Sequence, residues 1–470
     1  MLCWYNDYIK YEKEVTYMSF KKDFLWGVAS AAYQIEGGAF EDGKGLSIWD
    51  VYSHIPGKIK EEHNGDIACD HYHRYKEDVA LMKELGTKVY RFSVSWPRIL
   101  PNGVGEVNRK GIDFYNNLID ELIANDITPA LVLFHWDFPY ELYKKGGWLN
   151  NDVSEWFRYY TEVCTKAFGD RVKMWITFNE PQCFLGEGHL NGGTAPGIKM
   201  TVGDVVRMGH NVMLSHGKAV MEIRKNVENS IVGYAPSCDV CAPDTDKPED
   251  VEAARRRYFS FDEEWWMWNV SLWSDPVMLG RYPEEDPIFR RKLKPHLPEA
   301  YQDDMKIICQ PLDFYGQNIY TASHWTADEN GEAKWTRLPT GTAKSTNNWP
   351  LTPEALYWGP KFLYERYKTP IIITENGMAC HDWISVDGKV HDPNRIDYIT
   401  RYLRALRKCC EDGADIAGYW YWALLDNFEW GDGFTQHFGL VYMNYQTLER
   451  VKKDSFDFYR EVMATNGENI

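Results

Sequence analysis

The sequence predicts an α/β fold in which eight parallel strands close into one barrel with long loops after the strands. Short apolar stretches alternate with helical stretches eight times along the 470 residues, and such alternation indicates a parallel sheet. No Ser/Gly-rich or Pro-rich linker divides the chain, although its length alone would allow about three domains. A single (β/α)8 barrel, the TIM-barrel architecture, accounts for both observations because its loops can be long.

An open, doubly wound sheet is the alternative that the same alternation allows. Such sheets often bind a dinucleotide on a Gly-rich turn directly after the first strand. No turn of that kind follows the first expected strand, which leads instead to Gln34-Ile-Glu-Gly-Gly38. This absence weakens the open sheet, but the pattern alone leaves it open.

Eight strands are expected in chain order. The stretch 371–373 shows their character most clearly, because three isoleucines in a row predict a strand buried on both faces. The expected strands are 24–30, 88–94, 128–134, 172–178, 230–235, 312–320, 371–373 and 416–422.

Helices are expected between the strands, where apolar residues recur every three to four positions. In 108–125, for example, Ile112, Tyr115 and Leu118 follow this spacing, and in 78–85 the helical pattern stops at Gly86. The expected helices are 78–85, 108–125, 155–168, 202–227, 252–279, 352–368, 395–411 and 454–463.

The first 17 residues match no expected strand or helix. Met18-Ser19-Phe20 looks like a more natural beginning of the chain. We therefore expect an N-terminal extension over 1–17, which packs weakly or precedes the natural start, and one barrel over 18–470.

Composition restricts the partners. A net charge of −17 and a pI near 5.3 argue against a nucleic-acid or anionic-membrane partner. No apolar run reaches the roughly 18–20 residues that a membrane span needs. Ten cysteines without a dense framework predict free thiols in a reducing cytoplasm. Cys238 and Cys241 form a lone pair, whereas zinc would want four ligands, so no metal is expected.

Polar residues gather at the expected strand ends. In a barrel of this type, chemistry takes place at the carboxyl ends of the strands. Each such residue alone is weak evidence, but together they indicate a site. The residues at or just past strand ends are Gln34, Arg91, His135, Asn179, Glu180, Asn318, Tyr320, Glu375, Trp422 and Glu429.

Two glutamates among them, Glu180 and Glu375, could cleave a glycosidic bond. One carboxyl must be protonated to give a proton to the leaving oxygen, and the other ionised to attack the anomeric carbon or activate water. Their environments must therefore separate the two pKa values, and Arg91 is a candidate to keep Glu375 ionised. The alternative is that both are surface ion-pair residues.

Histidines and tryptophans also have structural explanations. His135 could be a hydrogen-bonded interior histidine, and we interpret His71 and His73 as structural residues rather than a metal pair. The 20 tryptophans fit a sugar site, since sugar rings pack their C–H faces on aromatic rings. We expect Trp420 in the core, on the other face of its strand from Trp422.

At these residues the chain resembles the β-glucosidases of glycoside hydrolase family 1, from about Phe20 to about Val462. Six segments together make the resemblance specific. They are Phe24-Leu-Trp-Gly27 with Gln34-Ile-Glu-Gly37, Tyr90-Arg-Phe-Ser-Val-Ser-Trp-Pro-Arg98, His135-Trp-Asp137, Thr177-Phe-Asn-Glu-Pro181, Ile373-Thr-Glu-Asn-Gly377 and Asp426-Asn-Phe-Glu-Trp430.

The resemblance implies a retaining mechanism with Glu375 as nucleophile and Glu180 as acid/base. It implies that Arg91, Tyr320 and Asn318 support the nucleophile, and that Trp349 forms a wall for the leaving group. It implies no metal and no cofactor. The residues that would hold the non-reducing sugar are Gln34, His135, Asn179, Trp422, Glu429 and Trp430.

The implied activity is an exo-acting β-glucosidase of carbohydrate metabolism and cellulose degradation. It would act on cellobiose, short cello-oligosaccharides and aryl β-glucosides, with β-galactosidase or β-fucosidase side activity. A 6-phospho-β-glucosidase and a catalytically silent carbohydrate-binding barrel stay open as alternatives, as does a homo-oligomer. Gln182, Thr194 and Tyr140 depart from the usual family residues, which leaves the aglycone preference unsettled.

Overall fold

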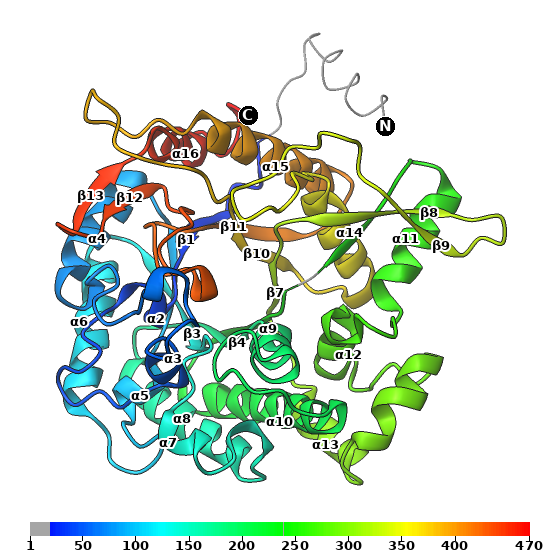
Figure 1. The fold of residues 1–470 in the computed structure, drawn as a ribbon, viewed down its shortest axis with the longest axis horizontal. Helices are drawn as coiled ribbons and strands as arrows, with labels where there is room; N and C mark the ends of the chain where they lie inside the picture. Colours follow the sequence, from blue (N-terminus) through cyan, green and yellow to red (C-terminus); the bar gives the residue numbers. More distant parts are fainter. Residues whose placement is uncertain (1–18, 238) are drawn as a thin grey trace.

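Eight parallel strands close into a barrel in the computed structural model, which describes residues 19–237 and 239–470 (Figure 1). The strands follow the order β1-β11-β10-β7-β5-β4-β3-β2 around the barrel. The predicted barrel is therefore confirmed and the open sheet is wrong. The predicted extension over 1–17, and Cys238, lie outside the described residues. The barrel strands are β1 Leu25–Ala29, β2 Val89–Ser93, β3 Thr128–Phe134, β4 Met174–Asn179, β5 Ile231–Ala235, β7 Phe314–Asn318, β10 Ile371–Asn376 and β11 Ile416–Trp422.

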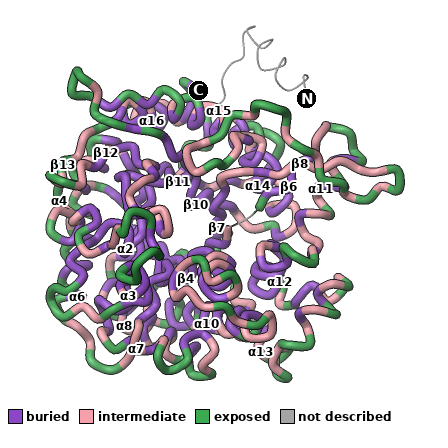
Figure 2. Tube along the Cα trace, viewed as in Figure 1, coloured by how far each residue is buried: buried purple, intermediate pink, exposed green. Residues whose placement is uncertain are grey.

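Long helices surround the barrel. Several consecutive helices contact one another around the ring, and the last helix contacts the first long one. Burial follows this arrangement, since the strands and the helix faces toward them are buried while the outer turns are exposed (Figure 2). The helices that ring the barrel are α4 His71–Leu85, α6 Arg109–Ala124, α8 Val153–Phe168, α10 Val202–Asn226, α13 Tyr301–Ile308, α14 Ala355–Tyr367, α15 Pro393–Glu411 and α16 Asp454–Ala464.

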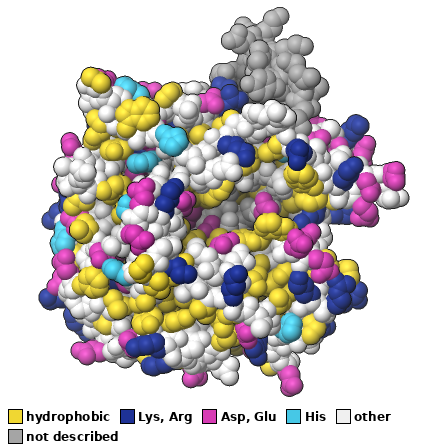
Figure 3. Space-filling model, in the orientation of Figure 1, with side chains coloured by type: hydrophobic (Ala, Val, Ile, Leu, Met, Phe, Trp, Pro, Cys, Tyr) yellow, Lys and Arg dark blue, Asp and Glu magenta, His cyan; other side chains and the backbone are white. Residues whose placement is uncertain are grey.

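The loops after the strands build the face of the molecule that carries the strand ends. Short helices lie in these loops, among them α2 Ala32–Ile35, α3 Ile48–Tyr52, α5 Trp96–Ile99, α7 Tyr140–Tyr143 and α9 Pro181–Leu185. Two small sheets also lie outside the barrel, one of β6 Val240–Pro243, β8 Ala322–Ala327 and β9 Ala333–Thr336, and one of β12 Val441–Asn444 and β13 Glu449–Lys452. The face is hollowed near its centre, and acidic side chains lie in the hollow (Figure 3).

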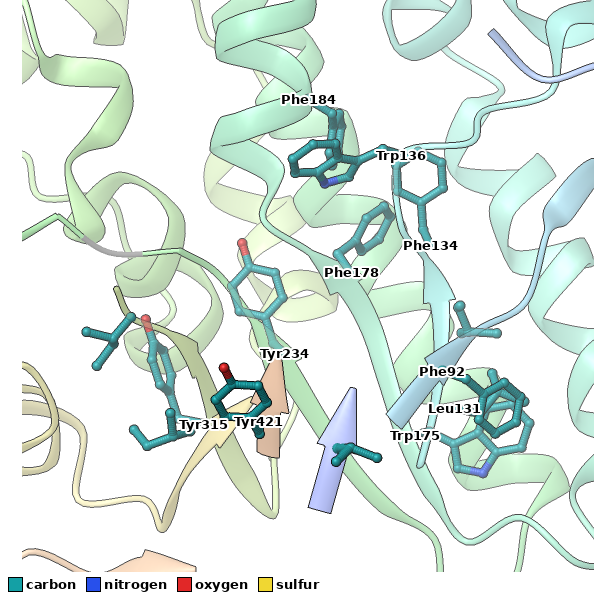
Figure 4. Close-up of a cluster of buried hydrophobic side chains, with 14 of the residues drawn as sticks. Phe92, Leu131, Phe134, Trp136, Trp175, Phe178, Phe184, Tyr234, Tyr315 and Tyr421 are labelled. Carbon is teal, nitrogen blue, oxygen red and sulfur yellow. The ribbon is translucent and has the colours of Figure 1, made fainter. Parts of the chain in front are cut away.

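Aromatic side chains fill the layer between strands and helices. Figure 4 shows Phe134, Phe178 and Phe184 gathered where β3 and β4 end, beside Trp136. The ring centroid of Phe134 lies 5.6 Å from that of Phe178 and 5.0 Å from that of Phe184. This packing supports the end of β4, from which the first glutamate projects.

The expected helix over 252–279 is wrong. The structure has α11 Pro248–Phe259 and α12 Val270–Leu279, with a single 3-10 turn between them. Two short polar side chains end the helical path, because Asp262 accepts backbone N–H groups of a turn and Asn269 caps α12 by accepting the N–H of Ser271. The Trp-rich apolar pattern concealed these two signals.

Two expectations about single residues have different outcomes. His71 begins α4 and its Nδ1 lies 2.7 Å from Asp78 Oδ2, so its structural interpretation is confirmed. Trp420 is buried as predicted, but the expectation that it faces away from Trp422 is wrong. Residues two apart on a strand share a face, and Trp420 lies in the apolar cluster inside the barrel, below Trp422.

Candidate active site

One extra residue on β10 and one on β4 change which side chains of these strands point into the barrel, and they turn Glu375 and Asn179 inward. On β10, Ile373 pairs with Gln317 of β7 but Glu375 pairs with the next residue, Asn318. On β4, Ile176 pairs with Gly233 of β5 and Asn179 with Ala235, which again leaves one residue unmatched. Such bulges reverse the alternation of side chains and often re-aim a residue beside an active site.

The consequence is clearest on β10. Ile372 lies in the cluster inside the barrel, and Ile371 and Ile373 pack outside it. Strict alternation would send Glu375 outward with these two odd-numbered residues. The bulge instead turns Glu375 inward, and Asn376 takes the outward position, where its Nδ2 donates to Tyr398 Oη at 2.8 Å.

Glu375 is held by a cation and a phenol. Arg91 Nη1 of β2 donates to Glu375 Oε1, and Tyr320 Oη donates to Oε2 at 2.8 Å. Arg91 is fully buried and Glu375 is 3% exposed. A buried ion pair with a second hydrogen bond fixes both carboxylate oxygens of Glu375 and favours its ionised form.

Glu180 has neutral partners. It follows β4 directly, and its Oε1 accepts from Asn318 Nδ2 at 2.9 Å. The same Asn318 amide donates to Asn179 Oδ1 at 2.9 Å, and Asn179 Nδ2 lies 3.1 Å from His135 Nε2. A chain of amides thus links Glu180 with His135.

The pKa values reflect these surroundings. Burial, and then the negative charge of Glu375, raises the pKa of Glu180 to about 8. Burial also raises the pKa of Glu375, but the charge of Arg91 and the hydrogen bond from Tyr320 act against that rise. At neutral pH the arrangement therefore places a proton on Glu180 and the negative charge on Glu375.

Among the residues predicted to hold the sugar, three polar atoms are buried and have no protein partner among the described residues. They are Gln34 Oε1, His135 Nδ1 and Glu429 Oε2. The Gln34 amide is held from its other end, since Nε2 donates to Asn427 Oδ1 at 3.0 Å and to the Phe428 carbonyl at 2.7 Å. Buried polar groups are normally paired, so these atoms are available to bind the hydroxyl groups of a ligand.

Aromatic rings complete this part of the site. The His135 ring stacks near Trp422 and Trp430, with centroids 5.9 and 5.7 Å away. Next to Tyr320, which donates to Glu375, lies Trp349; the two ring centroids are 5.0 Å apart and Trp349 is 39% exposed. The structure thus brings all twelve predicted site residues to one end of the barrel.

The sequence reasoning gave no role to one residue of the site, Trp136. Its ring stacks on Trp430 at 4.3 Å and its Nε1 donates to the Asn179 carbonyl at 3.1 Å. Trp136, Glu180 and Trp430 all have positive φ angles, 78°, 46° and 45°. Such backbone costs on the order of 1–3 kcal/mol per residue and clusters at functional sites. The available signal was the position of Trp136 directly after His135.

The reactive groups of the site are its two carboxyl groups. Within the described ranges, no group of three His, Cys, Asp or Glu side chains is arranged to hold a metal ion. A protonated Glu180 can transfer a proton, and an ionised Glu375 can attack an electrophilic carbon. The amides and aromatic rings around them can bind and orient a polar ring.

Comparison with known proteins gives consistent matches over nearly the whole chain. The model of glycosyl hydrolase family 1 matches residues 16–468. A 1,4-beta-D-glucan glucohydrolase of Thermotoga neapolitana is 43% identical over 95% of this chain and 99% of that protein. Beta-glucosidase A of Acetivibrio thermocellus is 44% identical over 96% of this chain and 99% of its own length.

A solved structure is similarly close. The beta-glucosidase from Thermotoga maritima in complex with glucoimidazole superposes with a TM-score of 0.87 at 42% sequence identity. The match covers 96% of this chain and 99% of that one. The complex of the same enzyme with deoxynojirimycin gives the same TM-score and identity.

Proposed function

The chain belongs to glycosyl hydrolase family 1, and on this premise we propose that it is a retaining β-glucosidase. It removes the terminal β-D-glucosyl unit from cellobiose, short cello-oligosaccharides and aryl β-glucosides. One observation carries the proposal: Glu180 and Glu375 share one site, but Arg91 forms its ion pair with Glu375 alone. That difference gives the two carboxyl groups the two roles that glycoside cleavage needs.

The reaction proceeds in two steps at the anomeric carbon. In the first, the Glu375 carboxylate attacks this carbon while Glu180 gives its proton to the glycosidic oxygen, and the bond between carbon and oxygen breaks. In the second, Glu180 takes a proton from water, whose oxygen attacks the same carbon and releases Glu375. Two inversions leave the product with the β configuration of the substrate.

The support for a glucosyl unit comes from the unpartnered atoms. Gln34 Oε1 and Glu429 Oε2 accept hydrogen bonds from sugar hydroxyls, and Trp430 lies against the sugar's C–H face. Asn179 holds the hydroxyl next to the reacting carbon. Because these groups bind by hydroxyl position and not by one unique contact, we expect weaker β-galactosidase and β-fucosidase activities as well.

An unphosphorylated sugar is favoured over a 6-phosphoglucoside. Burial raises the pKa of Glu429 to about 8, and the nearby charges of Glu375 and Asp432 contribute to the rise. The same burial and negative charges that disfavour the ionised form of Glu429 would also disfavour a phosphate dianion bound beside it. The glucoside, not its phosphate, is therefore the proposed substrate.

The leaving group lies on the exposed side of the site, against Trp349. Gln182, where many family members have Trp, is buried, and its Oε1 has no partner in the described part of the chain. A polar group there suits a sugar aglycone such as the second glucose of cellobiose. Cellulose degradation is accordingly the process we propose for the enzyme.

Two measurements test the proposal together. Initial rates with p-nitrophenyl β-glucoside, cellobiose, lactose, cellotriose and p-nitrophenyl 6-phospho-β-glucoside should place the phosphorylated compound last. Proton NMR during early turnover should show β-glucose as the first product. No turnover of any β-glucoside would leave the silent carbohydrate-binding barrel as the better explanation, and α-glucose first would overturn retention.

The cellular location stays a prediction. Among the helices that the structure describes, none is long and apolar enough to cross a membrane. Eight cysteines within the described ranges are free thiols, Cys69 and Cys164 among them. Free thiols support the proposed cytoplasmic location. A homo-oligomer also stays a prediction, which light scattering would test.

A further inference from the structure

A cluster of buried charges lies behind the residues that hold the sugar. It consists of two cations, Lys453 and Arg395, and three carboxylates, Asp382, Asp392 and Asp426, and is called the Lys453 cluster below. The side chains of all five are at most 1% exposed. Lys453 directly precedes α16, so a residue near the end of the chain reaches the barrel's catalytic end.

Lys453 bridges two loops that belong to different strands. Its Nζ donates to Asp382 Oδ2 at 2.6 Å and to Asp426 Oδ1 at 2.7 Å. Asp382 lies in the loop after β10, the strand of Glu375, and Asp426 lies in the segment after β11 that leads to Glu429. The ammonium group therefore joins the loop behind the nucleophile to the segment that carries sugar-binding residues.

Other contacts hold each carboxylate in place. Arg395 Nη2 donates to Asp382 Oδ2 at 2.6 Å and to the His437 carbonyl at 2.7 Å. Asp426 Oδ1 also accepts the N–H of Gly439 at 2.8 Å, and its Oδ2 lies 2.9 Å from His437 Nδ1. Burial alone would raise the pKa of Asp426, but Lys453 and His437 outweigh it and hold the pKa at about 2.

The cluster is connected to the sugar-binding atoms through a short stretch of backbone. Asp426 is followed by Asn427 and Phe428, and these two hold the Gln34 amide through its Nε2. Glu429 and Trp430 come next. A shift of Asp426 would therefore move Gln34 and Glu429 relative to Glu375, whose own loop is tied to the same ammonium.

We propose that Lys453 is a positioning residue for glucoside hydrolysis: its ammonium joins the loops after β10 and β11 and thereby sets Gln34 and Glu429 at the right place for the glucosyl hydroxyls. The inference rests on the proposed function. Buried ion pairs contribute little net stability compared with apolar packing, but they can specify one arrangement. A displacement of about 1 Å far from the chemistry can cost about 10²-fold in rate.

The alternative is that the cluster only stabilises the fold. The two roles differ in which quantity changes in folded protein at a temperature well below unfolding. A structural role lowers the melting temperature and leaves KM and ligand affinity as they are. A positioning role raises KM and weakens the binding of any glucose-shaped ligand, whatever the leaving group.

The test compares Lys453→Met with its neighbour Lys452→Met. Lys452 Nζ pairs with Glu84 and the side chain is 40% exposed, so Lys452→Met is the matched control. We expect Lys453→Met to raise KM for p-nitrophenyl β-glucoside and for cellobiose by the same factor, about tenfold or more. Calorimetry with 1-deoxynojirimycin should show a similar loss of affinity. The control should leave all three values unchanged.

A folded Lys453→Met protein with wild-type KM and wild-type affinity for 1-deoxynojirimycin would overturn the proposal. If Lys453→Met does not fold, the double variant Asp426→Asn/Lys453→Met removes the unpaired carboxylate as well. It should fold and still bind weakly, and wild-type affinity in it would equally overturn the proposal. Failure of the proposed function is a separate result, because it would be seen as absent turnover by the wild-type protein.

Discussion

The two sides of the nucleophile differ in how tightly they are built. On the glycone side, Gln34 and His135 are at most 2% exposed and their partners come from strand ends or from the loops directly after them. On the aglycone side, Trp349 is 39% exposed and lies in the long segment after β9. Under the proposed function, this difference means that buried hydrogen bonds fix one sugar, whereas the second partner meets a more exposed surface.

The largest effect is expected when Glu375, the proposed nucleophile that both sides of the site share, is removed. Glu375→Ala should lower kcat/KM by more than about 10³-fold for every β-glucoside, because the enzyme then has no carboxylate that can bond to the anomeric carbon. Rates with p-nitrophenyl β-glucoside and cellobiose measure it. Glu141→Ala, an exposed glutamate paired with Lys144, is the control. A residual activity above about one part in a thousand would contradict the assignment.

Removal of the acid should affect the two sides unequally. Glu180→Gln keeps an acceptor for Asn318 but has no proton to give. Hydrolysis of cellobiose should fall about 10²–10⁴-fold, whereas 2,4-dinitrophenyl β-glucoside, whose leaving group needs no proton, should lose much less in its first step. Burst kinetics separate that step. Equal losses for both substrates would argue against Glu180 as the acid.

The wild-type pH profile reports the same proton. Since the pKa of Glu180 is raised to about 8, kcat/KM for cellobiose should fall as the pH rises through that value. Burial is the first cause of the rise and the charge of Glu375 the second. A Glu375→Gln variant should therefore show a lower Glu180 pKa, measured by carbon NMR of labelled glutamate. An unchanged pKa would contradict the coupling.

A glycone-side substitution should have a smaller effect that is independent of the leaving group. Glu429→Gln should raise KM by about 10–100-fold for aryl glucosides and cellobiose alike, since a buried hydrogen-bonding group loses its match. Glu449→Gln, at an exposed glutamate of β13, is the control and should leave both KM values unchanged. A loss for cellobiose alone would move Glu429 to the aglycone side.

Glu429→Gln should also change how the free energy of unfolding depends on pH. Glu429 has a pKa of about 8 in the folded protein and about 4.3 in an unfolded chain. Between these values the folded state binds more protons, so the free energy of unfolding falls as pH rises from about 4 to 8. Urea titrations at pH 5 and 8 should show a smaller difference for Glu429→Gln than for the wild type.

The smallest effect is expected at the exposed wall. Trp349→Ala should change kcat/KM severalfold for p-nitrophenyl β-glucoside and leave methyl β-glucoside nearly unchanged, because only the larger aglycone contacts the ring. Exposed Trp335, in β9, provides the control as Trp335→Ala. A comparable loss with both glucosides would show that Trp349 supports Tyr320 and the nucleophile instead.

The two glutamates could be predicted from the sequence because each comes at the end of an apolar strand. Glu180 and Glu375 both stood at such positions. The inward direction of Glu375 could not be predicted, since alternation from Ile371 and Ile373 sends it outward and only the bulge in β10 reverses this. A bulge depends on pairing with β7 and β11, which a single stretch of sequence does not contain.

The aglycone side was less accessible to prediction. No strand or helix was expected between residues 321 and 351, and the structure places β8 and β9 there. The expected helix over 252–279 failed for a related reason, because the cap at Asn269 was hidden in a run of aromatic residues. In both segments the structure depends on contacts between loops, and not on apolar residues that recur at a regular spacing.

Azide rescue tests the central claim most directly, because it reads the role of each glutamate from the configuration of one product. With 2,4-dinitrophenyl β-glucoside, Glu375→Ala in azide should form α-glucosyl azide, since azide replaces the missing nucleophile and attacks once. Glu180→Ala should form β-glucosyl azide, since azide attacks after Glu375. β-Glucosyl azide from Glu375→Ala, measured by proton NMR, would contradict the account.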